Sequence, residues 1–166
     1  MSSVTAKAGF SERGGMWVIA QFALMLTVII LGAVFHGDWT PKNPIFYTSA
    51  GMFTLGGVFG VSGMIALGRN RTPFPRPRAD ATLIQGGIYA RVRHPLYTSV
   101  MMLSLSWAGF WQSWPALLAA LALIGLLAVK ARREEAWLRE KFPGYADYAR
   151  RVPGLFPRFW RRKDPL

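Results

Sequence analysis

Residues 17–35 read WVIAQFALMLTVIILGAVF and decide the fold class, because Gln21 is the one strongly polar interruption in 19 residues. A helix of about 20 apolar residues crosses a hydrocarbon core of about 30 Å. The run is longer than the apolar stretch of a signal peptide, about 7–15 residues, and no clear small-x-small cleavage site follows it. We therefore interpret it as an uncleaved membrane span.

Three further apolar runs lie outward from this one, at about 47–67, 94–110 and 114–129. The second run has 21 residues, whereas the last two are near the lower limit for a span. The stretch between the last two carries no charge, which indicates a tight helical hairpin. The sequence predicts an all-α polytopic integral membrane protein with four transmembrane helices and a cytoplasmic C-terminal helical segment, a single membrane domain over 1–166. Buried helices of a soluble bundle are the alternative.

The composition agrees with a membrane protein. Apolar residues make up 52% of the chain and charged residues 17%, against about a quarter in soluble domains. The absence of cysteine excludes disulfides, thiolate metal ligands and cysteine nucleophiles. With two histidines in the whole chain, we predict no metal site.

The charges predict the topology. The chain has 20 Lys and Arg against 8 Asp and Glu, a net charge of +12. Basic residues are concentrated in 68–93 and from 130 onward, whereas the loop 36–46 is neutral and the hairpin turn is uncharged. By the positive-inside rule, we expect both termini to be cytoplasmic, and we expect the protein to lie in the inner (plasma) membrane. Because the arginines flank spans and no nucleic-acid motif is present, we expect the lipid bilayer as partner and no nucleic acid.

The second apolar run is rich in glycine. Gly56 and Gly60 form a small-xxx-small step that permits close helix approach. This step fits packing inside the monomer, a homodimer face, or space for a ligand or lipid chain. It is not a phosphate loop, because it follows no strand.

Polar residues gather near the predicted cytoplasmic mouth of the third span. The proline- and arginine-rich stretch 69–78 is predicted to be an extended, water-exposed connector. Arg93 and His94 then precede Pro95, which suits the first turn of a helix. Such an N-terminus is a ready anion site, although Arg93 taken alone also fits an arginine that reaches lipid phosphate.

An acidic pair, Glu134 and Glu135, lies on the predicted cytoplasmic extension of the fourth helix. The plain interpretation is a solvated helix surface, in which Glu134 pairs with Lys130 and Glu135 with Arg139 at i,i+4 spacing. A turn at 142–144 then leads into a short helix.

Taken together, these elements form an ordered pattern: Gly87-x-Tyr89, Arg93-His94-Pro95-x-Tyr97, a helical hairpin, Glu134-Glu135-x-x-Leu138, and Phe142 with Tyr145-x-x-Tyr148. The pattern, over about 83–157, resembles the isoprenylcysteine carboxyl methyltransferase and phospholipid methyltransferase superfamily of integral membrane enzymes. One departure is Ser99, where the family often has glycine.

The resemblance implies S-adenosylmethionine as cofactor, S-adenosylhomocysteine as product, and a cofactor pocket facing the cytoplasm. The acceptor would be lipid-like or otherwise membrane-accessible, with a carboxylate, amine or thiol. Glu134 and Arg93 would be catalytic, with one glutamate facing the cofactor and the other orienting an arginine. The cofactor-binding residues carried over are Gln85, Gly87, Tyr89, Arg93, His94, Pro95, Tyr97, Glu134, Glu135 and Tyr145.

A second hypothesis is a small membrane transporter or a lipid-binding membrane subunit without catalysis. Ion pathways require acidic or polar residues within the spans. Gln21 is nearly the sole candidate, and no Asp or Glu lies within a predicted span. This distribution favours the enzyme.

Overall fold

The computed structural model describes residues 9–37, 44–77 and 79–156, and these residues form helices and no strand. The helices are α1 (Gly15–Val34), α2 (Pro44–Leu67), α3 (Pro95–Phe110), α4 (Trp114–Lys141) and α5 (Tyr145–Arg151), with short 3-10 turns η1 (Gly68–Asn70) and η2 (Gly87–Ala90). The predicted all-α class is confirmed, as is the extension of the fourth helix beyond residue 129.

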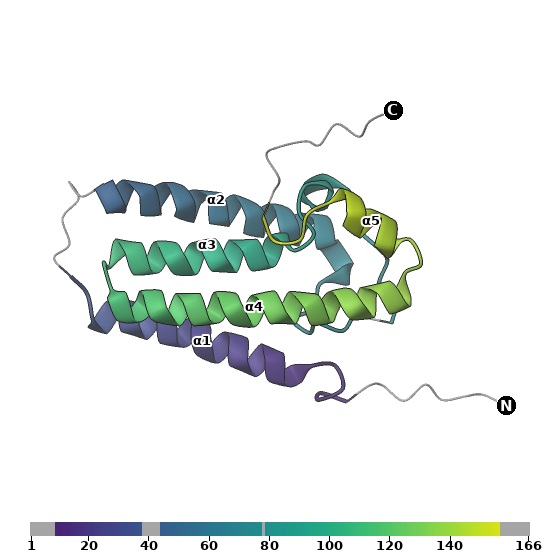
Figure 1. Cartoon of the computed structure of the whole chain (residues 1–166), viewed down its shortest axis with the longest axis horizontal. Coiled ribbons are helices and arrows are strands. Elements are labelled where there is room, and N and C mark those ends of the chain that lie inside the picture. The colour runs from purple at the N-terminus through teal and green to yellow at the C-terminus, as the bar shows by residue number, and fades with distance from the viewer. Residues whose placement is uncertain (1–8, 38–43, 78, 157–166) are drawn as a thin grey trace.

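The long helices lie side by side in the order α2, α3, α4, α1 (Figure 1). The tight hairpin between α3 and α4 is confirmed, and its far end is fastened to α1. Trp107 Nε1 donates to the Ile29 carbonyl at 3.2 Å, and Ser113 Oγ donates to the Leu31 carbonyl at 3.0 Å. Ser113 also caps α4 by accepting from the Ala116 amide, as serine commonly does before a helix.

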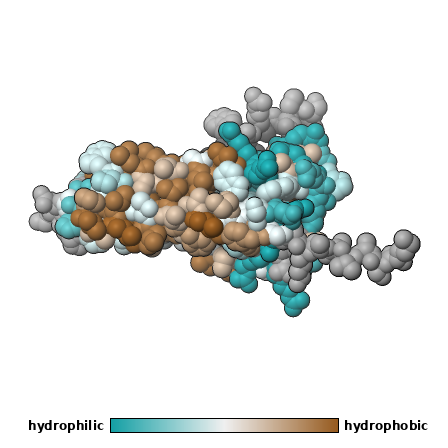
Figure 2. Space-filling model, turned by 90° about the horizontal axis from the view of Figure 1, so that it is seen from below, coloured by the Kyte–Doolittle hydropathy of each residue, from teal (hydrophilic) through white to brown (hydrophobic). Residues whose placement is uncertain are grey.

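Three of the described helices, α1, α2 and α4, are long and apolar enough to cross a membrane. At 16 residues, α3 is about 24 Å long and falls short of that length; its role as a fourth span remains a prediction. Apolar residues cover the helix layer, and hydrophilic residues gather at the end that carries α5 (Figure 2). The start of α1, η1, η2 and α5 all lie at this polar end (Figure 1).

The glycines of α2 let it approach α3 closely. A Cβ on Gly56 would lie 3.1 Å from Met102 Cβ, and one on Gly60 would lie 2.6 Å from Ser99 Oγ. The small-xxx-small step is therefore used inside the monomer. Gly57 faces open space, so a homodimer through this helix, one of the alternatives for the glycine-rich run, would use that other face of α2. Ser99, the departure from the family pattern, packs at this seam.

Candidate functional site

A pocket lies at the polar end of the layer, over the start of α3 and between the end of α2 and the extension of α4. Its empty volume is about 810 Å³, including the part open to solvent. Six of the residues predicted to bind the cofactor line it: Tyr89, Arg93, His94, Tyr97, Glu134 and Tyr145. The structure thus brings together side chains from η2, α3, α4 and α5.

Arg93 is largely committed to contacts within the chain. Its Nε and Nη2 donate to Oε1 of Glu135 at 3.0 and 2.6 Å, and its Nη1 donates to the carbonyls of Ala149 and Val152, each at 2.6 Å. A guanidinium has five N–H groups, so little donor capacity is left for a ligand. Arg93 therefore fixes Glu135 and the segment that follows α5.

The backbone continues this attachment. The amides of Arg93 and His94 donate to the carbonyls of Pro153 and Gly154 at 2.9 and 3.0 Å, and the Thr98 hydroxyl donates to the Leu155 carbonyl. Leu155 packs against the apolar core between α3 and α4. The segment 152–155 is thereby held across the start of α3.

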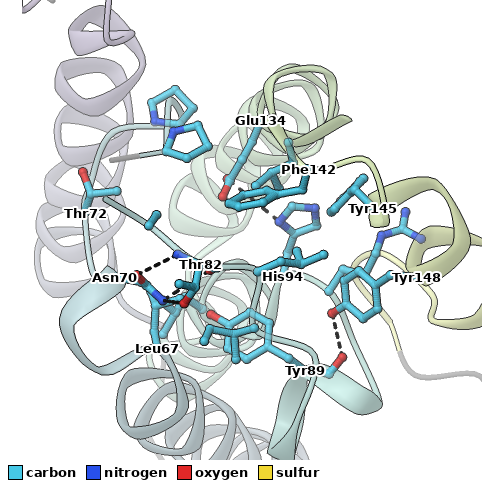
Figure 3. Close-up of a pocket in the computed structure, with 18 of the residues that line it drawn as sticks. Leu67, Asn70, Thr72, Thr82, Tyr89, His94, Glu134, Phe142, Tyr145 and Tyr148 are labelled. Atoms are coloured by element: carbon cyan, nitrogen blue, oxygen red, sulfur yellow. Dashed lines mark hydrogen bonds and ion pairs between the residues drawn. The ribbon is translucent and has the colours of Figure 1, made fainter. Parts of the chain in front are cut away.

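The two adjacent glutamates point to different surroundings, since neighbouring helix residues are about 100° apart. Glu135 is buried and accepts from Arg93, from Nε2 of His94 at 3.1 Å when the proton is on that nitrogen, and from Arg139 at 3.1 Å. Glu134 lines the pocket and accepts from the Tyr97 hydroxyl at 2.6 Å. Its Oε2 lies 3.9 Å from His94 Nδ1 (Figure 3).

This geometry tests the two i,i+4 ion pairs that the sequence predicts for Glu134 and Glu135. The i,i+4 contact of Glu135 with Arg139 is confirmed. The predicted pair of Glu134 with Lys130 is wrong: Lys130 donates to Gln21 and to the Pro73 carbonyl instead, because it is turned into the interior.

Burial keeps the pocket tyrosines protonated. It raises the pKa of the Tyr89 and Tyr145 hydroxyls well above their usual value near 10, and raises that of Tyr148 to about 12. The Tyr148 hydroxyl donates to the Tyr89 carbonyl at 2.6 Å (Figure 3). The Tyr145 hydroxyl is buried and has no hydrogen-bond partner among the described residues.

Four predicted residues do not line the pocket. Gln85 is exposed, and Glu135 lies behind the lining in the ion-pair cluster. Gly87, with φ of +61°, opens the turn that carries Tyr89, and Pro95 is buried in the first turn of α3. Their predicted contact with a cofactor remains a prediction. No group of three or more His, Cys, Asp or Glu able to hold a metal ion occurs within the described parts of the chain.

The prediction of a water-exposed connector over 69–78 is confirmed for Arg69, Arg71, Pro73 and Arg76, which are exposed, but is wrong for Phe74 and Pro75. Phe74 and Pro75 line the pocket, and Pro75 is fully buried. Reciprocal hydrogen bonds between Asn70 and Thr82 close the loop at its base (Figure 3). Phe74, an aromatic residue among prolines and arginines, is the one signal in the sequence that points to this burial.

The comparisons with known proteins bear on the family to which the chain belongs. The model of the family described as "Phospholipid methyltransferase" matches residues 45–144, which include Arg93, His94 and Glu134. The chain is 31% identical to the cobalt-zinc-cadmium resistance protein CzcN of Cupriavidus metallidurans and 30% identical to the nickel-cobalt-cadmium resistance protein NccN of Alcaligenes xylosoxydans xylosoxydans. Each match covers 89% of this chain, and the chain spans 64% and 65% of these relatives. Because the family model covers more than half of the chain, this integral membrane protein belongs to the phospholipid methyltransferase family, within the superfamily of membrane methyltransferases that its motifs resemble.

Proposed function

We propose that the protein is an S-adenosylmethionine-dependent membrane methyltransferase acting on a lipid-like or otherwise membrane-accessible acceptor. One observation carries the proposal. In a chain of the phospholipid methyltransferase family, the Glu134 carboxylate lines an aromatic pocket at the polar end of an apolar helix layer. In this proposal the polar end faces the cytoplasm, where the cofactor is dissolved, and the helices face the lipid.

The residues of the pocket fit this cofactor, which carries an ammonium, a carboxylate, a ribose, an adenine and a sulfonium. Glu134 would accept hydrogen bonds from the ammonium or the ribose. Tyr145 supplies a buried, unpartnered hydroxyl, and the rings of Tyr89 and Phe142 offer faces for adenine or sulfonium.

Arg93 takes a positioning role in this proposal. The family resemblance implies a catalytic role for Arg93, but its hydrogen bonds go to Glu135 and to two main-chain carbonyls. It would hold the wall formed by the segment after α5 and leave Glu134 as the charged group facing the ligand.

The bound cofactor supplies an electrophilic methyl group on its sulfonium. The chain's own contribution is alignment and exclusion of water, which in-line displacement requires more than covalent catalysis. An amine acceptor must first lose a proton, and Glu134 is the candidate base because the pocket tyrosines stay protonated. A carboxylate or thiolate acceptor needs no base.

The second candidate is a membrane subunit without catalysis, and the names of the two relatives suggest metal resistance as the process to which it would contribute. Such a subunit has no reason to bind S-adenosylhomocysteine. Binding of this product therefore separates the two candidates.

The test is isothermal titration of the purified protein with S-adenosylhomocysteine. Glu134→Gln should weaken binding about 10- to 150-fold, because a charge-assisted hydrogen bond is worth about 1.5–3 kcal/mol. The matched control is Glu140→Gln, an exposed residue on the same helix, which should bind like wild type. Absence of binding by the wild type at millimolar ligand would contradict the function, and an unaffected Glu134→Gln would contradict the site.

A further inference from the structure

The turn at residues 9–14, which precedes α1, packs against the pocket loop 71–77. The guanidinium carbon of Arg13 lies 4.0 Å from the centroid of the Phe74 ring. The Phe10 ring meets the same ring edge-on, with 5.6 Å between the two centroids. A guanidinium over an aromatic face is attracted to the negative charge of that face, and the attraction grows as water is excluded. The turn therefore holds the Phe74 side chain from two directions.

The backbone of the turn is closed and packs on the next residue of the loop. The Gly14 amide donates to the Ser11 carbonyl at 2.9 Å. Gly14 has φ of +82°, a left-handed conformation that glycine adopts without strain, and a Cβ on it would lie 2.7 Å from Pro75 Cγ. Pro75 is fully buried. The turn thus contacts two successive residues of the loop.

These two loop residues, Phe74 and Pro75, also line the candidate cofactor pocket. The other attachments of the loop act elsewhere. Asn70 and Thr82 close its base, and Lys130 holds the Pro73 carbonyl at 3.1 Å. The turn before α1 is different because it contacts the side chains that form the pocket wall.

We propose that Arg13 is a positioning residue of the pocket, a role that rests on the proposed function. It holds Phe74 in place as a wall of the ligand site, so the apparent affinity for the ligand falls with the fraction of molecules in which the wall is in place. The family model matches residues 45–144 and assigns no role to the turn. In this proposal the segment before the first apolar span contributes to ligand binding.

Two competing explanations give Arg13 a different role. In the first, the turn only stabilises the start of α1, so that replacing Arg13 lowers the melting temperature and leaves the affinity of the folded protein unchanged. In the second, the charge of Arg13 acts on a charged ligand through space and independently of Phe74. A double-mutant cycle with Phe74 distinguishes all three, because residues that act through one contact have non-additive effects.

The experiment titrates S-adenosylhomocysteine against the full chain in detergent, below the melting temperature of every variant. We expect Arg13→Gln to bind about fivefold more weakly, a loss of about 1 kcal/mol, which lies within the range of a cation–π contact. The control is Arg76→Gln, which makes the same change of charge at an exposed position of the same loop and should bind like wild type. Phe74→Leu keeps an apolar wall, so binding stays measurable. In that background Arg13→Gln should change the affinity by less than about twofold.

Phe10→Leu is a second variant in case Arg13→Gln does not fold. Phe10 is 54% exposed, and its replacement keeps an apolar side chain. Loss of the edge-on contact should weaken binding about threefold, and again by less than about twofold in the Phe74→Leu background.

Wild-type affinity in Arg13→Gln would overturn the proposal, and so would a loss of the same size with and without the Phe74 ring. Where Arg13→Gln does not fold, the same two results for Phe10→Leu overturn it. If the wild type does not bind S-adenosylhomocysteine, the proposed function itself fails. If the wild type binds and the variants do not weaken binding, only the role of Arg13 fails.

Discussion

Glu134 and Glu135 show how one residue step on a helix separates a carboxylate that lines the pocket from one that is held in an ion-pair cluster. Glu135 accepts from Arg93, His94 and Arg139, and its side chain is 12% exposed. It balances the charge of Arg93 at the point where the chain after α5 is attached to α3. Removing one member of a buried ion pair leaves the other charge uncompensated.

Glu135→Gln should therefore act on stability. We expect it to lower the free energy of unfolding by about 3–5 kcal/mol, the usual cost of breaking a buried pair. Arg139→Gln is the comparison, because Arg139 contacts the same carboxylate but is 52% exposed, and its loss should cost about 1 kcal/mol or less. Thermal unfolding in detergent measures both variants. Equal destabilisation by the two variants would show that the contacts of Glu135 with Arg93 and His94 do not contribute to stability beyond its contact with Arg139.

The sequence predicted that the two glutamates have different surroundings but not which of them faces the pocket. The family resemblance, combined with the step of about 100° between neighbouring helix residues, implies that one glutamate faces the cofactor and the other orients an arginine. Which glutamate does so depends on how α4 is rotated against α3, and that rotation is set by packing over the whole length of both helices. The predicted pair of Lys130 with Glu134 is wrong for the same reason. The Lys130 side chain turns toward α1, where its Nζ donates to Gln21.

The seam between α2 and α3 sets the position of one wall of the pocket. Gly56, Gly60 and Gly63 let α2 lie against α3, and Leu67 at the end of α2 then forms one wall of the pocket. Close approach through small residues is a common way to associate helices in lipid, where the hydrophobic effect contributes little.

A matched pair of substitutions tests this seam. Gly56→Leu would place side-chain atoms on Met102 and Leu103 and should destabilise the fold by about 1–3 kcal/mol or more, the cost of overpacking. Gly57→Leu, one residue along, meets open space and should leave the melting temperature near that of wild type. A lower melting temperature for Gly57→Leu than for Gly56→Leu would contradict this packing of α2 on α3.

The helices could be predicted from the sequence, whereas the packing of the loop 71–77 against the pocket could not. Long apolar runs and the position of Pro95 place α1, α2, α3 and α4 correctly, since these signals are local. The burial of Phe74 depends on a distant partner: the Arg13 guanidinium lies 4.0 Å from its ring centroid, and the Phe10 ring packs edge-on against it. The phenylalanine is a local signal of burial, but no local pattern identifies Arg13 and Phe10 as its partners.

The whole molecule consists of an apolar helix layer with one polar end. The start of α1, the connection between α2 and α3, and α5 lie at that end (Figure 1), and they carry the basic residues that the positive-inside rule places in the cytoplasm. A water-soluble cofactor would enter the pocket there, while an acceptor with an apolar part would arrive through the lipid.

Transfer of labelled methyl groups in oriented membrane vesicles tests the central claim most directly. Labelled S-adenosylmethionine, which is charged and stays outside sealed vesicles, is added to inside-out and right-side-out vesicles containing the wild type or Glu134→Gln. The account predicts that label enters an organic-soluble product in inside-out vesicles with the wild type, and that Glu134→Gln reduces this incorporation at least tenfold, the lower end of the expected loss of binding (about 10-fold). Incorporation no greater than with Glu134→Gln in either orientation would contradict the methyltransferase assignment, and incorporation confined to right-side-out vesicles would contradict the cytoplasmic site.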